Sequence, residues 1–478
     1  MTGNADGFNN SEDAFSTQSN GSTLGVVSPS HLPPEFYNAY LSTAAKERKP
    51  SPIRSLLPLE STPGLISLLA GKPNATTFPF TSLSFTARSP VDDGPETAIS
   101  LTETELEEAL QYGATDGLKQ LRNWIVGLQQ FSHGRKLDGG WKVSIGSGSL
   151  DLIYKAVAAT VNKGDSVLVE SPVYAGVLPI FQSRNCELVA VETDSCGIQS
   201  SSLRSILENW PVGKPRPKIL YTVPYGCNPT GMTATLERRK EVLQLAREYN
   251  ILILEDDPYY YLYYGDGPRY PSYFALELEE PEVGRVLRFD SLSKILSAGL
   301  RIGFASGPEP LIQAMDRHTG SSNLQTSTFT QVVAYKLLDA WGYDHFKIHT
   351  EKVSAFYRGK RDIFERIMNK HLSGLAQWSS PEAGMFFWFK LILNEDKIAE
   401  DGDSEAIIRT KAFDRGVLAL PGTVFFPDGR KTAYVRAAFS LSTEPEVEEA
   451  LKRLRQVILE ARAEAKEVAG NKAGSRFW

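Results

Sequence analysis

The chain has 478 residues, of which 41% are hydrophobic and 23% are charged, and its formal net charge is −6. This length exceeds a single ordinary hydrophobic core, so we expect two domains with the composition of a soluble globular enzyme. The sequence has no run of 18 apolar residues, so no membrane span is predicted. It also has no long basic run, so a nucleic-acid groove is not expected.

The sparse cysteines and histidines do not form a metal or disulfide pattern. The chain has three cysteines, and their spacing favours a reducing compartment. His345 and His349 stand four residues apart, as in a zinc protease helix, but Phe346 occupies the position of the general-base Glu. A helix-surface pair is therefore the preferred interpretation, and no metal is expected. The first Lys or Arg is Lys46, which disfavours a secretory or mitochondrial leader and predicts a cytoplasmic location.

Changes in composition along the chain predict five segments. Residues 1–30 are rich in Ser, Asn, Gly and Thr and predict a disordered tail. Residues 31–60, broken by Pro33, Pro34, Pro50 and Pro52, predict an N-terminal arm that also forms part of the small domain. We expect a large domain over 61–345, a small domain over 346–465, and a frayed tail over 466–478.

Strand, turn and helix patterns alternate between about residues 100 and 310. Residues 141–161 read as strand, turn and helix, and 233–250 read as a helix. Further strands are predicted within 165–172, 186–192, 217–224, 251–260 and 285–294. This alternation predicts an α/β fold, in which a mostly parallel sheet is sandwiched by helices. After about 345, a long charged helix, three strand-like segments and a helix near 445–465 predict a smaller α+β domain. In such sheets ligands bind beyond the carboxyl ends of the strands.

The first motif at such a strand end is Gly146-Ser147-Gly148-Ser149. Backbone N–H groups at a helix N-terminus favour an anion, and glycines allow close approach. A plain tight turn is at least as favoured by this motif alone. As a dinucleotide fingerprint it is incomplete, because Asp151 takes the place of the third glycine and its charge would oppose a pyrophosphate.

Two more motifs follow apolar strands. In "VPYGCNPTG" (223–231), Asn228 could point an amide into a site, although a plain turn is favoured for this motif alone. In "LEDDPYY" (254–260), the strand ends in two aspartates that each need a cationic partner in a low-dielectric site. Asp256 would suit a protonated heterocyclic nitrogen, and Tyr259 could present a phenol to the same ligand. A solvated loop start is an equal alternative.

The fourth motif is "FDSLSKILSAGLRIG" (289–303). Ser291, Ser293 and Arg301 supply hydroxyls and a planar cation that suit a phosphate. Desolvation and a nearby cation would lower the pKa of Lys294 and make it a nucleophile towards an aldehyde. Together the four motifs require a ligand with a monophosphate, an aldehyde, a phenolic oxygen and a ring nitrogen. Pyridoxal 5′-phosphate has all four.

The motifs "NPTG", "EDDPYY", "SLSKILSAGLRIG" and "AYVRAAFS" resemble those of fold-type I, class I aminotransferases that depend on pyridoxal phosphate. The resemblance runs from about residue 51 to about residue 460. It is strongest to the branch of aromatic amino-acid and kynurenine/α-aminoadipate aminotransferases.

This resemblance implies a role for each motif residue. Lys294 would bond to the aldehyde and transfer the proton, Asp256 would pair with the ring nitrogen, and Tyr174 would stack on the ring. The other implied cofactor contacts are Asn228 and Tyr259 at the ring oxygen, and Ser149, the Leu150 backbone N–H, Ser291, Ser293 and Arg301 at the phosphate.

The resemblance also implies substrate contacts and a partner. Arg436 would clamp the substrate α-carboxylate near Asn228, Arg54 would belong to a mobile lid, and Gly71 would let the backbone approach the substrate. Tyr112 would reach the phosphate of a neighbouring subunit, which implies a homodimer with shared active sites. Three positions depart from the branch or vary within it: Leu150, Lys72 and Tyr225.

The expected function is transamination between an amino acid and a 2-oxo acid such as 2-oxoglutarate, by a ping-pong route through pyridoxamine phosphate. The tyrosine-rich stretch 259–274 and the resemblance favour an aromatic donor, although most of these tyrosines suit the core or a dimer seam. Arg54 could instead pair with a distal carboxylate, as aminoadipate or glutamate would offer. Aminoadipate or kynurenine as the main donor stays open as an alternative. A β-lyase on the same scaffold is a further alternative. A ligand-sensing module and a nicotinamide dehydrogenase are disfavoured.

Overall fold

The computed structural model describes residues 29–92, 94–137, 140–394 and 402–474. Most of the predicted 1–30 tail lies outside the described residues. Ser30, however, belongs to a short strand, β1 (Ser30–His31), which pairs in parallel with β10 (Glu282–Val283). No helix in the described ranges is both long and apolar enough to cross a membrane.

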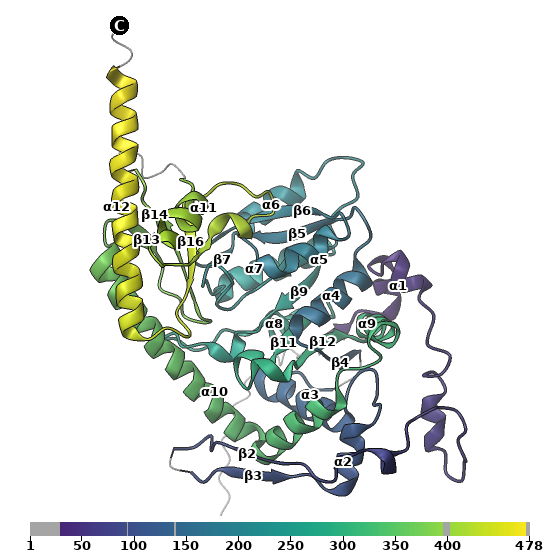
Figure 1. The fold of residues 1–478 in the computed structure, drawn as a ribbon. Coiled ribbons are helices and arrows are strands. Elements are labelled where there is room, and N and C mark those ends of the chain that lie inside the picture. The colour runs from purple at the N-terminus through teal and green to yellow at the C-terminus, as the bar shows by residue number, and fades with distance from the viewer. Residues whose placement is uncertain (1–28, 93, 138–139, 395–401, 475–478) are drawn as a thin grey trace, which may run out of the picture.

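An eight-stranded sheet forms the centre of the molecule (Figure 1). Its order is β4-β12-β11-β9-β8-β5-β6-β7, and the ladder from β11 through β9, β8 and β5 to β6 is parallel. The bounds are β4 Trp141–Gly146, β5 Ser166–Ser171, β6 Glu187–Asp194, β7 Gly197–Ile198, β8 Ile219–Thr222, β9 Leu252–Asp256, β11 Val286–Ser291 and β12 Gly303–Pro308. The predicted mostly parallel sheet is confirmed. The sequence did not predict β12, which runs antiparallel between β4 and β11.

Helices cover both faces of this sheet because successive residues of each buried strand point to opposite sides. One hydrophobic core joins α4 (Ser149–Thr160), α5 (Leu178–Gln182) and α9 (Glu309–Ser322) to residues such as Tyr221, Leu254 and Phe289. The other joins α3 (Lys119–His133), α6 (Ser200–Glu208), α7 (Leu236–Glu248) and α8 (Tyr273–Leu276) to residues such as Leu220 and Ile253. The alternation decides which side chains can meet at the strand ends.

A smaller antiparallel sheet follows in the chain, in the order β13-β14-β16-β15. Its strands are β13 Ala376–Trp378, β14 Phe386–Leu391, β15 Leu420–Pro421 and β16 Tyr434–Ala438. The long helix α10 (Thr328–Leu372) leads into this sheet, and α12 (Glu444–Gly474) packs beside it and projects beyond the body (Figure 1). α10 begins earlier than the helix predicted from residue 345, and Gly342 interrupts it with φ 62°. α12 extends into the predicted 466–478 tail.

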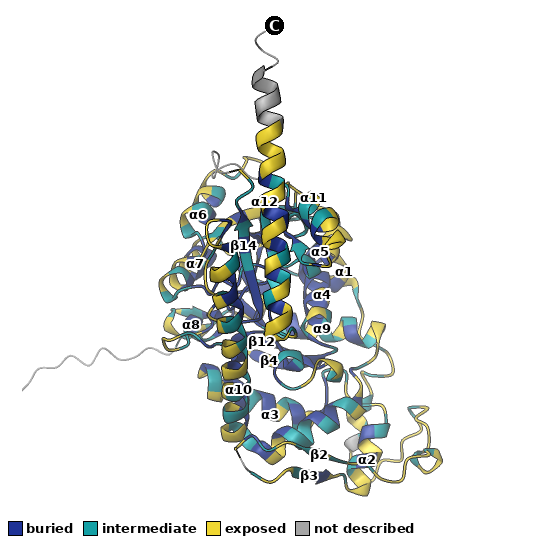
Figure 2. Cartoon of the chain, turned by 60° about the vertical axis from the view of Figure 1, so that its left-hand side comes forward, coloured by how far each residue is buried: buried dark blue, intermediate teal, exposed yellow. Residues whose placement is uncertain are grey.

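The N-terminal part of the chain packs on the body and then leaves it. A 3₁₀ helix, η1 (Pro34–Ala39), and α1 (Thr43–Glu47) are held by Tyr37 and Tyr40, whose hydroxyls donate to the carbonyls of Gly284 and Asn250. The chain then runs outward through η2 (Leu57–Ser61) and η3 (Ala75–Thr77) to the hairpin β2–β3 (Ser84–Ala87, Thr97–Ser100) and α2 (Glu103–Leu110). Figure 2 shows that this outward stretch is largely exposed, whereas the central sheet is buried.

Candidate active site

The four sequence motifs meet at one edge of the large sheet. β5, β8, β9 and β11 are parallel, and β4 runs the same way because two antiparallel pairings separate it from β11. All five strands therefore end at the same edge. The motifs around Ser149, Asn228, Asp256 and Lys294 each follow one of them.

A cradle suited to an anion forms where the loop after β4 meets the loop after β11. The Arg301 guanidinium donates to Ser293 Oγ at 3.2 Å and to the Ser147 carbonyl at 3.0 Å, and Ser291 Oγ accepts from the Ser293 N–H at 3.2 Å. Gly148 precedes α4 with φ +95°, and a Cβ there would lie 2.4 Å from an Arg301 nitrogen. Serine hydroxyls, a guanidinium and a helix N-terminus together suit a phosphate group.

Asp151, in the first turn of α4, does not face this cradle with a free charge. Its carboxylate accepts from the Ser147 N–H at 3.0 Å and from Lys155 Nζ at 2.8 Å. Lys155 is 1% exposed, so the ion pair is shielded from water on the lysine side. The charge that would oppose an anion is therefore held inside the turn.

Lys294 ends a 3₁₀ turn, η7 (Leu292–Lys294), directly after β11. Its amine is partly buried, and burial followed by the charge of Arg301 lowers the Lys294 pKa from its ordinary value. A lowered pKa leaves more of the amine neutral and able to act as a nucleophile or base. The next residue is also fixed, because His349 Nε2 on α10 donates to the Ile295 carbonyl at 2.6 Å. Sequence reasoning treated His349 as a surface residue and missed this contact.

Asp256 ends β9 with a buried carboxylate whose two oxygens differ. Oδ2 accepts a hydrogen bond of 2.6 Å from the Tyr221 hydroxyl, whereas Oδ1 is buried and has no hydrogen-bond partner among the described residues. Burial raises the Asp256 pKa to about 7, opposed by the Tyr221 hydrogen bond; Asp290 raises it further and Arg288 lowers it. An orphaned buried carboxylate oxygen fits a cationic N–H donor from a ligand.

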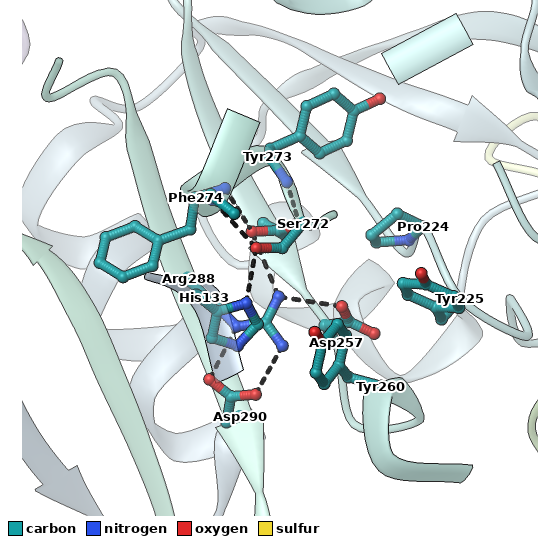
Figure 3. Close-up of polar contacts among 12 residues, drawn as sticks. His133, Pro224, Tyr225, Asp257, Tyr260, Ser272, Tyr273, Phe274, Arg288 and Asp290 are labelled. Carbon is teal, nitrogen blue, oxygen red and sulfur yellow. Dashed lines mark hydrogen bonds and ion pairs between the residues drawn. The ribbon is translucent and has the colours of Figure 1, made fainter. Parts of the chain in front are cut away.

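The second aspartate of the pair points to the other face of the sheet. Asp257 Oδ2 accepts from Arg288 Nη1 at 2.9 Å, and Asp290 accepts from the same guanidinium at 2.7 and 2.9 Å, as Figure 3 shows. Glu255 lies 3.3 Å from Arg288, and all four side chains are buried. Among the described residues, the cationic partner expected for each aspartate is thus found for Asp257 but not for Asp256.

Arg436 on β16 reaches the site from the small sheet. Its Nη1 donates to Asn228 Oδ1 at 2.8 Å, and its guanidinium lies 4.3 Å from the centre of the Phe386 ring. Its Nε is buried and has no hydrogen-bond partner in the described chain. Tyr174 and Tyr259 are close enough to interact electrostatically with both Asp256 and Arg436, and burial is the main cause that raises their pKa values. The large and small sheets therefore both supply side chains to this site.

Three predicted site residues lie apart from this group in the single chain. Arg54 donates to the Gly113 carbonyl at 3.1 Å and to Thr115 Oγ1 at 2.8 Å, beside the exposed Tyr112. Gly71 has nothing within 4 Å of the place where a Cβ would stand. Within the described ranges, no hydrogen bond or ion pair joins Arg54 or Tyr112 to the Lys294 group.

Comparison with known proteins identifies the family to which this chain belongs. The family model for aminotransferase class I and II matches residues 85–454, most of the chain. The chain belongs to this aminotransferase family. It therefore has the fold-type I architecture and is an enzyme that depends on pyridoxal phosphate.

Individual relatives agree with this aminotransferase assignment. The chain is 42% identical to the aminotransferase tdiD of Emericella nidulans, over 86% of this chain and 94% of that protein. It is 37% identical to the mitochondrial kynurenine/α-aminoadipate aminotransferase of Mus musculus, over 89% and 99%. The crystal structure of a Pyrococcus horikoshii kynurenine aminotransferase in complex with PMP, KYN and KYA is 31% identical, with a TM-score of 0.67 over 89% and 98%.

The aminotransferase site fits its cofactor by its own chemistry. The Arg301 cradle suits the cofactor's phosphate, and the partly buried amine of Lys294 suits its aldehyde. Asp256 Oδ1, which has no partner among the described residues, suits its protonated ring nitrogen. Tyr221 and Arg288 were not predicted to contribute to this site, because each lies inside an apolar strand pattern.

Proposed function

We propose that the enzyme transfers the amino group of an aromatic amino acid to a 2-oxo acid such as 2-oxoglutarate. The observation that carries this proposal is the convergence of Lys294, the free oxygen of Asp256 and the Arg301 cradle at one sheet edge. The names of relatives that act on kynurenine support an aromatic donor. Because one site would serve both half-reactions, we expect ping-pong kinetics.

Different residues of the chain would bind different parts of the cofactor. Ser291, Ser293, Arg301, Ser149 and the Leu150 N–H would hold the phosphate, whereas Asn228 and Tyr259 would hold the ring oxygen and Tyr174 would cover the ring face. Asp256 would hold a proton on the ring nitrogen. When bound, pyridoxal phosphate supplies the electron sink for the charge left on the substrate α-carbon. Lys294 Nζ would remove the α-proton and return a proton, which makes one residue both general base and general acid.

Arg436 would bind the substrate α-carboxylate, because its guanidinium is half-enclosed and its Nε has no partner in the described chain. Arg436→Lys should lower kcat/KM for amino acids by roughly tenfold or more, since an ammonium cannot reproduce a bidentate contact. Steady-state kinetics with several donors measures this effect. Lys390→Arg on β14 provides a cation-exchange control, and an unchanged kcat/KM in Arg436→Lys would remove Arg436 from carboxylate binding.

We propose a homodimer in which Tyr112 and Arg54 serve the partner's site. The two residues lie together, away from Lys294 of their own chain, and a hollow of about 520 Å³ lies beside Tyr112. Apolar side chains on the outward stretch are exposed in the single chain, namely Ile53, Leu59, Leu65, Ile66 and Leu68. An exposed apolar surface of this kind is typical of an interface. Gly71 lies on the same stretch, so its proposed approach to the substrate also involves the assembled dimer.

The donor is tested by mixing the yellow holoenzyme with single amino acids, without a 2-oxo acid. We expect aromatic amino acids and kynurenine to bleach the absorbance in one half-reaction, and 2-oxoglutarate to restore it. A preference for α-aminoadipate, the other substrate in the name of the Mus musculus relative, would replace the aromatic assignment. Release of ammonia and pyruvate without an acceptor would indicate a β-lyase. The cytoplasmic location stays a prediction.

A further inference from the structure

The Asp256 carboxylate has one hydrogen bond within the described chain, and its donor is a tyrosine. Tyr221 lies on β8, fully buried, with its hydroxyl 2.6 Å from Asp256 Oδ2. Burial, with Asp256 as a further cause, raises the Tyr221 pKa well above its ordinary value. The hydroxyl therefore keeps its proton and can only donate to the carboxylate, which must accept.

The strand register sets this contact. Tyr221 pairs with Leu254 in the parallel ladder between β8 and β9, so Tyr221, Leu254 and Asp256 share one face of the sheet. The Tyr221 ring is packed edge-on against Phe181, with the ring centres 6.3 Å apart. The ring is therefore fixed on two sides, and its hydroxyl fixes the rotation of the Asp256 carboxylate so that Oδ1 is the oxygen left without a donor.

Asp256 forms no ion pair with any charged group in the described part of the chain. From β11, Asp290 and Arg288 act on it in opposite directions, and Arg288 is already bound by Asp257 and Asp290 on the other face. From β5, the buried Glu170 lies close enough to interact electrostatically with Asp256, and its own carboxylate accepts from Thr222 Oγ1 and the Val223 N–H. Tyr174 and Tyr259 stand nearby as neutral phenols. The Tyr221 hydroxyl is thus the one direct donor to Asp256 in the described chain.

We propose that Tyr221 is a positioning residue, which orients Asp256 Oδ1 towards the cofactor's ring nitrogen and keeps this carboxylate ionised so that the proton stays on the ring. The inference rests on the role proposed above for Asp256. A neutral hydroxyl suits this task better than a cation, because a direct Arg or Lys partner would weaken the carboxylate's hold on the ring proton. Without any donor, the buried carboxylate would instead take the proton itself.

The test replaces Tyr221 by Phe, which removes only the hydroxyl. In holoenzyme carrying a ¹⁵N-labelled ring, we expect the proton equilibrium between the ring nitrogen and Asp256 to shift towards Asp256 by about tenfold or more. In the apoenzyme, infrared titration should show the Asp256 pKa rising by about one pH unit or more. Tyr260→Phe is the matched control, because it removes a buried hydroxyl that donates to the Ser132 carbonyl and does not touch Asp256.

A second variant should shift the Asp256 pKa and the protonation of the ring nitrogen in the opposite direction. 3-Fluorotyrosine at position 221 is a stronger donor, so it should lower the Asp256 pKa and favour the ring-protonated form. This result remains informative if Tyr221→Phe does not fold. If both substitutions leave ring protonation and the Asp256 pKa at the values of Tyr260→Phe, the inference about Tyr221 is wrong. If Asp256→Asn itself leaves ring protonation unchanged, the proposed role of Asp256 fails instead, so the two failures can be separated.

Discussion

Lys294→Ala should abolish transamination while the protein still binds pyridoxal phosphate through the Arg301 cradle. The substitution removes the amine that is proposed to bond to the aldehyde and to move the α-proton, so we expect kcat to fall by on the order of 10⁴-fold. The Arg301 cradle should keep its geometry, because Arg301 is held by Ser293 and the Ser147 carbonyl rather than by Lys294. Single-turnover kinetics and equilibrium dialysis measure the two effects separately.

Lys294→Arg is the control for charge. It keeps a cation beside Arg301 but cannot act as the nucleophile, so it should be as inactive as Lys294→Ala. Lys347→Ala changes an exposed lysine whose ion pair is with Glu351 at 3.8 Å, and it should keep wild-type turnover. Normal turnover by Lys294→Ala would refute the assignment of the catalytic amine.

Asp256→Ala should cripple proton abstraction, with kcat lower by on the order of 10³-fold. In the proposed role of Asp256, the substitution would leave the ring nitrogen without its acceptor, so less of the cofactor would carry the ring proton that stabilises charge from the α-carbon. Exchange of the substrate α-hydrogen for solvent deuterium follows this step directly. The rate of exchange should fall together with kcat.

Asp257→Asn is a closely matched control, because it changes the adjacent carboxyl, which faces Arg288 on the opposite side of the sheet. Arg288 keeps Asp290 and Glu255 as partners, so the exchange rate should stay within a few-fold of wild type. Equal losses in Asp256→Ala and Asp257→Asn would point to general disruption of the strand end rather than to a role for Asp256 at the ring.

The sequence located this site because its chemistry lies in loops that follow apolar strands. Parallel strands end at one edge, so Asp256 and Lys294 could be predicted to lie at the same edge of the sheet from the strand pattern alone. The contacts inside the strands could not be predicted in this way. Tyr221 stands in "ILYTV", where its hydroxyl looks incidental, and only the register of β8 against β9 places it beside Asp256.

Two features of the fold were also not predicted from the sequence, and each has a physical cause. The strand β12 reads "GFASGP", which is poor in the β-branched residues that predict strands, and its place between β4 and β11 depends on long-range pairing. The start of α10 was missed because Gly342, with its positive φ, interrupts the helical pattern before residue 345. In the homodimer proposed above, Arg54 and Gly71 would contact the substrate only after assembly with a second chain, and no pattern within one chain predicts that arrangement.

The environment of Arg436, in its proposed role, predicts which amines bind the enzyme poorly. One guanidinium nitrogen is already used by Asn228, and Nε is buried without an acceptor in the described chain. An amine that has lost its carboxyl group would fill the side-chain space but leave this N–H unsatisfied and cut off from water, which is a large penalty for a buried donor. If Arg436 binds the α-carboxylate as proposed, decarboxylated products of the same amino acids should therefore be poor competitive inhibitors.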